Sequence, residues 1–298
     1  MLFRITEKLL KLISTFAILI FFTLDAFAEM PGMSGEIRRE YSDTSFGRVH
    51  LWTMGDGPAL LLIHQSGQTS DEYLSLAPVL ADSFKVIGID LPNHGQSDSS
   101  KYELNADEFG DVVIEVLDNI GVEKIHILGQ HGGASIGINL GIRYPDRVGK
   151  LILSGAGREE NQTQEQIQEM IDRPMTRDLP VDMDGEFLDK TWNVYRKMSA
   201  STTTPDVTFR PFLTSLINRQ RKFDMHYAIF RYQPNLDDLK KETLLLEGEE
   251  DMYAGDVAGL QKRIKKSIIV KLPGVGSWQF YENPELHDDV ITEFLLND

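Results

Sequence analysis

The chain has 298 residues, of which 41% are hydrophobic and 9% aromatic, enough to build one large globular domain or one domain with an insertion. Its formal net charge of −16 repels nucleic acid and anionic membrane surfaces, so that small molecules are the expected partners, although the charge also serves solubility. Cysteine is absent, which excludes disulfides and leaves the hydrophobic core to hold the fold together.

The first 28 residues have the pattern of a secretory signal peptide. A basic start is followed by an apolar run over residues 12–24, which is too short to span a bilayer, and by the small-x-small cleavage sequence AFA at 26–28. We therefore expect cleavage after Ala28, export to the periplasm or the medium, and no stable membrane insertion afterwards. An uncleaved N-terminal anchor is the alternative.

Residues 29–157 alternate short apolar strands with helical patterns and are interpreted as the N-terminal part of an α/β core. The first two strands resemble an antiparallel pair. Each later strand is followed by a helix, which is typical of the βαβ units of a parallel sheet. The expected strands are 37–41, 49–52, 59–64, 85–90, 124–128 and 150–154, and the expected helices are 71–80, 106–120 and 134–143.

Residues 158–235 show no strand pattern, but they contain polar helical segments rich in aromatic residues. The strand and helix alternation resumes over 236–298, with strands at 243–248 and 267–272 and helices from 255 and over 284–296. A helical block inserted into a resumed parallel sheet predicts a lid over the carboxyl ends of the strands, where open sheets bind ligands. The expected fold is a mostly parallel eight-stranded sheet flanked by helices, with this helical lid.

The stretch GQHGGASIG, residues 129–137, contains two overlapping candidates for a catalytic turn between a strand and a helix. Residues 133–137 match G-x-S-x-G, with Ser135 at the centre. Residues 129–133 have the same spacing with His131 at the centre. Such a turn must follow its strand at once, and the strand pattern ends at Leu128. We therefore predict His131 at the tip of the turn and Ser135 in the following helix.

Several motifs resemble those of the α/β-hydrolase superfamily over nearly the whole chain after residue 28. The segment RYPDRV at 143–148 resembles the end of the helix behind the nucleophile, at a distance that fits position 131. The loop LLIHQSG at 61–67 resembles the one that supplies an oxyanion amide, and IGIDLPNHGQSD at 87–98 resembles the next strand and loop. GEED at 248–251 and GVGSWQFYENPE at 274–285 resemble the loops that carry the catalytic acid and base.

The chain departs from the superfamily pattern at three of these positions. His131 stands where the nucleophile is expected, Ser277 stands where the histidine base is expected, and Gln65 replaces a loop glycine. Asp251 keeps the identity of the catalytic acid. The motif H-Q-x-x-x-x-S-D-E-Y at 64–73, together with G-x-H-x-G, is similar to that of a divergent branch of the superfamily, a resemblance that implies no known reaction.

Three functions fit this exchange of residues. In the first, His131 is a general base supported by Asp251, and a small, largely apolar ester or carbonyl substrate reacts without a covalent intermediate. The amides of Gly132 and of the Gln65-Ser66 turn hold the oxyanion. In the second, Ser277 is the nucleophile and His131 its base, but the oxyanion amides are then misplaced. In the third, the fold is a catalytically silent module that binds a small ligand.

The remaining residues suggest no other chemistry. No spacing of histidine and acidic residues predicts a metal site, and no glycine-rich loop predicts a dinucleotide, so we expect neither metal nor cofactor. His64 and His94 resemble structural histidines of the superfamily, and His226 is a further candidate for the site. The following aromatic residues of the expected lid are interpreted mainly as its core: Trp192, Tyr195, Phe209, Phe212, Phe223, Tyr227, Phe230 and Tyr232.

Overall fold

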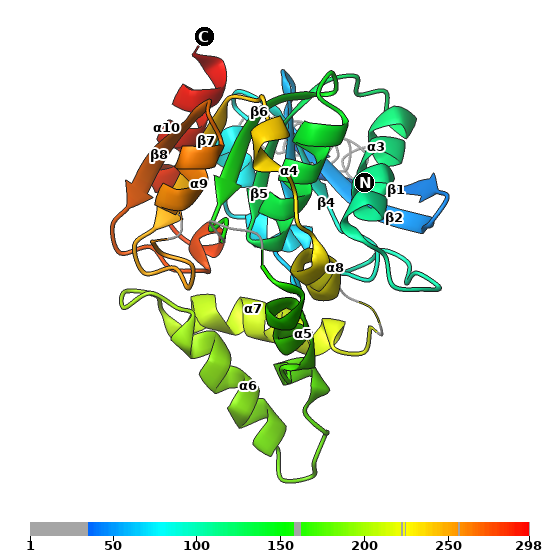
Figure 1. Ribbon diagram of the computed structural model, residues 1–298, viewed down its shortest axis with the longest axis vertical. Coiled ribbons are helices and arrows are strands. Elements are labelled where there is room, and N and C mark those ends of the chain that lie inside the picture. The colour runs from blue at the N-terminus through cyan, green and yellow to red at the C-terminus, as the bar shows by residue number, and fades with distance from the viewer. Residues whose placement is uncertain (1–34, 158–161, 222, 224, 256, 298) are drawn as a thin grey trace, which may run out of the picture. The chain divides into compact units, whose positions relative to one another are not determined.

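The centre of the molecule is an eight-stranded sheet with the strand order β1-β2-β4-β3-β5-β6-β7-β8 (Figure 1). The computed structural model describes residues 35–157, 162–221, 223, 225–255 and 257–297, so the expected signal peptide lies outside the described residues. Strand β2 pairs antiparallel with β1 and β4, and the other neighbouring strands pair in parallel. The strands are β1 Arg38–Thr44, β2 Gly47–Met54, β3 Ala59–Ile63, β4 Lys85–Ile89, β5 Ile125–Gln130, β6 Val148–Ser154, β7 Thr243–Gly248 and β8 Ser267–Leu272.

Helices cover both faces of the sheet, because its central strands bury side chains on both sides. In β3, Leu61 and Ile63 belong to one core cluster, and Leu60 and Leu62 belong to the other. This alternation follows the two-residue period of a strand. The first cluster is covered by α3 (Ala106–Asn119), α4 (Gly132–Arg143) and α9 (Val257–Arg263), and the second by α2 (Ala77–Leu80) and α10 (Pro284–Leu296).

Between β6 and β7 the described chain is helical, and we call this segment, residues 162–235, the helical insertion. Figure 1 shows α6 and α7 lying beyond one end of the sheet, while α8 lies close to α4. The insertion consists of α5 Gln164–Asp172, η2 Thr176–Asp178, α6 Glu186–Lys197, α7 Pro205–Asn218 and α8 Met225–Arg231. Whether it moves as a lid stays a prediction.

The expected strands and helices are all observed within a few residues of their expected bounds, except that one helix is divided. The helix expected over residues 71–80 is divided into a 3₁₀ turn, η1 Ser70–Tyr73, and the single-turn helix α2. Pro78 explains the division, since it has no N–H to donate to a preceding turn. Strand β5 runs to Gln130, two residues beyond the expected end. The two other 3₁₀ turns are η3 Leu236–Asp238 and η4 Gln279–Tyr281.

Within the described part of the chain, no helix has the length and apolar character needed to cross a membrane.

Candidate active site

His131 occupies a tight turn between β5 and α4. Its backbone has φ 47° and ψ −108°, a conformation that an L-residue adopts at a cost of about 1–3 kcal/mol. The turn is held by the His131 N–H, which donates to the Ser154 carbonyl at 2.9 Å, and by the His131 carbonyl, which accepts from the Ala134 N–H at 3.0 Å. The strained residue between the strand and the helix is therefore His131, and Ser135 lies in α4.

Two glycines allow the strand and the helix to approach at this turn. A Cβ on Gly133 would lie 2.1 Å from the Ile63 carbonyl oxygen, and a Cβ on Gly129 would lie 2.4 Å from the Gly133 carbonyl oxygen. Both contacts are far shorter than packing permits, so the spacing G-x-H-x-G is required by the backbone itself. The glycine requirement belongs to the turn around His131, as the spacing predicts.

The imidazole of His131 is held between a glycine and a tyrosine. A Cβ on Gly155, at the end of β6, would lie 2.3 Å from His131 Cδ2, so only glycine leaves room for the ring there. The ring of Tyr253 meets the imidazole edge to face, with the centroids 4.9 Å apart. Tyr253 and Gly155 were not predicted as site residues, because both reach the site from loops after other strands.

Asp251 binds the imidazole from the loop after β7. His131 Nε2 lies 2.9 Å from Asp251 Oδ2, and the His131 and Asp251 side chains are only 7% and 1% exposed. The Tyr253 N–H donates to Asp251 Oδ1 at 2.8 Å. Burial alone would raise the pKa of Asp251, but the charge and hydrogen bond of His131 and the Tyr253 N–H outweigh it and hold the pKa below its ordinary value. Asp251 is thus an ionised acceptor, and His131 Nε2 is the donor.

The other imidazole nitrogen, Nδ1, is not used by this pair. Among the residues that the structure describes, none forms a hydrogen bond with His131 Nδ1. A neutral histidine that donates Nε2–H to a carboxylate keeps the Nδ1 lone pair as an acceptor. The pair therefore has the electronic arrangement of a general base supported by a carboxylate.

Ser277 is near the same carboxylate but is committed to other contacts. Its hydroxyl oxygen accepts the Met252 N–H at 3.2 Å, and its O–H, as a donor to the carboxylate, helps to lower the pKa of Asp251. The residue is 1% exposed, and no hydrogen bond joins it to His131 among the described residues. The structure brings His131, Asp251 and Ser277 together around one carboxylate, without the serine–histidine contact that a nucleophile needs.

The residues predicted to supply oxyanion amides differ in whether their backbone N–H already has a hydrogen-bond partner. A Cβ on Gly132 would lie 2.3 Å from Ser66 Oγ and 3.3 Å from Ser66 N, so the two turns approach closely. Gly132 is the first residue of α4, where the N–H has no partner within the helix, and Ser66 N–H has no hydrogen bond within the described chain. Gln65 requires a correction, because its backbone N–H already donates to Glu72 Oε1 at 2.9 Å.

Glu72 and three glutamines form a buried polar network behind the site that the sequence did not reveal. The side-chain amide of Gln65 donates to Glu72 Oε2 at 3.0 Å, and the amides of Gln65 and Gln130 both reach the Ser277 carbonyl at 3.4 Å. Gln279 continues the network to Gln130. Burial raises the pKa of Glu72 to about 8, against the lowering effect of the Gln65 hydrogen bonds. The network fixes the Gln65 and Ser277 loops relative to each other.

The helical insertion packs directly on the Ser277 loop. The rings of Tyr195, in α6, and Trp278 are stacked with centroids 5.0 Å apart, and Trp278 Nε1 donates to the Tyr195 carbonyl at 3.0 Å. The Ser277 N–H donates to the Met198 carbonyl at 3.1 Å. Phe212 joins Tyr195 in the same buried cluster. At least two of the aromatic residues expected in the lid are therefore core residues.

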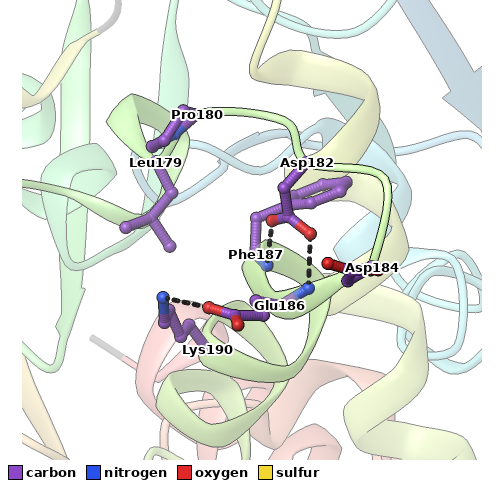
Figure 2. Close-up of a pocket in the computed structure, with 7 residues that line it drawn as sticks. All are labelled: Leu179, Pro180, Asp182, Asp184, Glu186, Phe187 and Lys190. Atoms are coloured by element: carbon purple, nitrogen blue, oxygen red, sulfur yellow. Dashed lines mark hydrogen bonds and ion pairs between the residues drawn. The ribbon is translucent and has the colours of Figure 1, made fainter.

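A cavity lies within the helical insertion, away from this site. It has a volume of about 250 Å³ and is lined by residues 179–190 (Figure 2). Figure 2 shows that the Asp182 carboxylate accepts the N–H groups of Glu186 and Phe187, while Lys190 pairs with Glu186. Its charged groups stabilise the start of α6, and we assign it no chemistry. In the described residues, histidine and acidic side chains form no group of three that could hold a metal ion.

Comparison with known proteins gives the same fold. The model of the alpha/beta hydrolase fold family matches residues 58–284. The chain is 23% identical over 276 residues to the 2-hydroxy-6-oxononadienedioate/2-hydroxy-6-oxononatrienedioate hydrolase of Escherichia coli (strain K12), which covers 83% of this chain and 91% of that protein.

Two solved structures have a similar architecture. A thermophilic esterase from Thermogutta terrifontis has a TM-score of 0.72 and 20% identity, over 87% of this chain and 98% of that chain. A meta-cleavage product hydrolase from Pseudomonas fluorescens IP01 has a TM-score of 0.69 and 20% identity, over 86% and 96% of the two chains. At this identity the likeness shows the fold alone. With the family model covering most of the described residues, the chain belongs to the alpha/beta hydrolase fold family.

Proposed function

We propose that the protein hydrolyses a small, largely apolar ester or related carbonyl compound, with His131 as a general base and without a covalent intermediate. The observation that carries this proposal is the 2.9 Å hydrogen bond between His131 Nε2 and Asp251 Oδ2. It fixes the orientation of the imidazole, stabilises the imidazolium that forms when the base takes a proton, and leaves Nδ1 as the acceptor.

In the proposed reaction a water molecule gives a proton to His131 Nδ1 as its oxygen attacks the substrate carbonyl carbon. The negative charge that develops on the carbonyl oxygen is stabilised by the N–H groups of Gly132 and Ser66. The imidazolium then gives this proton to the alcohol oxygen of the ester as the bond between that oxygen and the carbonyl carbon breaks. Asp251 stays ionised throughout and balances the charge on the ring.

The local contacts of Ser277 favour this mechanism over one in which the serine is the nucleophile. Its hydroxyl is bound at the Asp251 loop, and it is 1% exposed. The similar proteins support hydrolysis in general, since those named above are hydrolases or an esterase. They do not bear on the exchange of residues at positions 131 and 277.

The test is hydrolysis of a panel of small esters and lactones by purified wild-type protein and by His131→Ala. We expect wild-type turnover that falls by about 10²–10⁴-fold in the variant, which is the usual contribution of a general base. A fluorophosphonate probe for activated serines is expected to leave the wild type unlabelled. Equal background rates for both proteins on every substrate would contradict hydrolysis and support the binding module instead.

We also propose that the mature protein is exported and begins at Glu29, as the signal-like N-terminal sequence predicts. N-terminal sequencing of protein recovered from the periplasm or the medium checks this. Retention of the first residues in a membrane fraction would support the anchor instead.

A further inference from the structure

A second, smaller cavity lies where the helical insertion meets two loops of the sheet. Its volume is about 50 Å³, and we call it the arginine cavity, after Arg177 and Arg219. The loop after β3 contributes Gly67, and the loop after β4 contributes His94. Among the described residues that line it, none is an aspartate or a glutamate. Arg177 is paired at 3.8 Å with Asp178, which does not line the cavity, so the excess positive charge at the cavity rests on Arg219.

Arg219 carries an uncompensated charge at this cavity. Its Nη2 donates to the carbonyls of Arg177, at 3.3 Å, and Leu179, and its guanidinium lies 4.8 Å from the centre of the Phe187 ring. Nη1 is buried and has no hydrogen-bond partner, and no carboxylate of the described residues pairs with Arg219. A buried cation costs free energy unless an anion or several acceptors replace its water, and here one nitrogen has neither.

Asn218 fixes the position of the cavity wall beside Arg219. Its side-chain nitrogen donates to the Gly67 carbonyl at 3.1 Å, and its side-chain oxygen accepts the Gly95 N–H at 3.2 Å. One residue at the end of α7 thus joins both loops to the insertion. The guanidinium of the next residue, Arg219, is positioned by these bonds and by the two backbone carbonyls that accept from its Nη2. The cavity is therefore formed in advance of any ligand.

We propose that the arginine cavity binds the carboxylate group of a small ligand, with Arg219 as its main cationic contact. A water molecule occupies about 30 Å³ in the liquid, so a volume of about 50 Å³ suits a group of a few atoms and not a whole substrate. A planar carboxylate also matches the geometry of a guanidinium. Arg219 itself lines the cavity, and its printed hydrogen bonds go only to backbone carbonyls, so its positive charge is left for an anion to balance.

The proposal concerns binding and holds whether or not His131 is catalytic. Gly67 directly follows Ser66, so the cavity wall continues into the turn that faces Gly132. If one molecule occupies both the arginine cavity and the site at His131, the substrate has a carboxylate at one end and its ester or carbonyl group at the other. That extension rests on the proposed function, whereas carboxylate binding does not.

The experiment is calorimetric titration of purified protein with acetate and with acetamide, its neutral isostere. We expect the wild type to bind acetate more tightly than acetamide by about tenfold or more, because only the anion compensates the guanidinium. Arg219→Met keeps much of the aliphatic length and removes the charge, and it is expected to weaken acetate binding by about tenfold or more. Arg210→Met is the matched control, since Arg210 lies exposed on the same helix, and it is expected to bind acetate as the wild type does.

Amide NMR of the wild type keeps the proposal falsifiable if Arg219→Met does not fold. Acetate is expected to shift the amide signals of Gly67 and His226, which line the cavity, and acetamide at the same concentration is expected to shift them much less. Unchanged acetate affinity in a folded Arg219→Met, equal affinity of the wild type for the two probes, or the absence of these shifts would overturn the proposal. None of these readouts depends on turnover, so failure of the proposed hydrolysis is recognised separately.

Discussion

Two buried pairs of histidine and aspartate can be compared within the described part of the chain, and they differ in what the second ring nitrogen meets. His50 Nδ1 lies 3.0 Å from Asp90 Oδ2, and His131 Nε2 lies 2.9 Å from Asp251 Oδ2. All four side chains are almost fully buried. By residue type, distance and burial the pairs are nearly the same.

The two pairs differ in the hydrogen bonds that their surroundings provide. Asp90 also accepts hydrogen bonds from the Ser70 N–H and hydroxyl and from the Gln96 N–H. His50 Nε2 lies 3.4 Å from the Gln96 side-chain amide, and His50 lies within the regular strand β2. His131, in contrast, has a strained backbone at the end of β5 and an Nδ1 without a partner in the described chain.

The difference shows that a histidine–aspartate contact by itself does not indicate catalysis. A pair whose acceptors and donors are all satisfied holds loops together, as His50 and Asp90 hold β2 to the loop after β4. A pair that leaves one nitrogen open on a strained turn is available for proton transfer. We therefore expect mutations of the first pair to affect stability and mutations of the second pair to affect rate.

The largest expected effect is on catalysis by the second pair. Asp251→Asn is expected to lower kcat/KM on a substrate found in the panel by about 10²-fold or more, because a neutral amide cannot balance the imidazolium. Asp90→Asn, the matched change in the first pair, is expected to leave the kcat/KM of the folded protein unchanged. Steady-state kinetics on both variants checks this, and similar losses in both would remove the distinction between the pairs.

The next effect is on stability. Asp90→Asn is expected to lower the free energy of unfolding by about 3 kcal/mol, since it breaks a buried pair and disturbs the hydrogen bonds from Ser70 and Gln96. Urea unfolding of the variant and the wild type, followed by circular dichroism, measures the difference. A loss below about 0.5 kcal/mol, typical of a surface change, would show that the first pair is not structural.

A smaller effect is expected on the pH dependence of stability. Burial would raise the pKa of Asp90, but the hydrogen bond from His50, the charge of His64 and the hydrogen bonds from Gln96 and Ser70 lower it from 3.8 to about 2. The ionised form is therefore favoured by folding, and its contribution is present above pH 3.8 and lost as the pH falls towards about 2.

Over that pH range the wild type is expected to lose about 2 kcal/mol more of its free energy of unfolding than Asp90→Asn. Urea unfolding at a series of acidic pH values gives the two curves. Parallel curves would mean that folding does not lower the pKa of Asp90.

The smallest effect is expected at the serine of the literal G-x-S-x-G sequence. Ser135→Ala is expected to leave kcat/KM nearly unchanged, because Ser135 lies in α4 and not at the turn. Active-site labelling with a fluorophosphonate, followed by peptide mass spectrometry, is the independent check. Rapid labelling of Ser135 would overturn the assignment of the turn to His131.

The sheet and the position of the turn were predictable because both depend on local pattern. Apolar runs bounded by polar residues mark β3, β4 and β7, and the glycines at 129 and 133 mark the turn through their spacing. The pairing of His131 with Asp251 followed from the resemblance to the superfamily. The sequence did not indicate which nitrogen of His131 meets the carboxylate.

What could not be predicted depends on loops that meet only in the folded chain. Glu72 and Gln65 were visible within one motif, but nothing in their spacing indicates that Glu72 takes the Gln65 backbone N–H. Tyr253 and Gly155 reach the His131 ring from different loops, and Arg219 meets its cavity through the packing of α7. The side-chain pattern of a single strand or helix does not indicate such contacts.

The most direct test of the account compares Ser277→Ala with His131→Ala on one substrate from the panel. Because His131 is proposed as the base and Ser277 only binds the Asp251 loop, kcat/KM of Ser277→Ala is expected to exceed that of His131→Ala by about 10²-fold or more. A ratio of one or less, with both variants folded, would contradict the account, because it would give the serine a part in catalysis at least equal to that of the histidine.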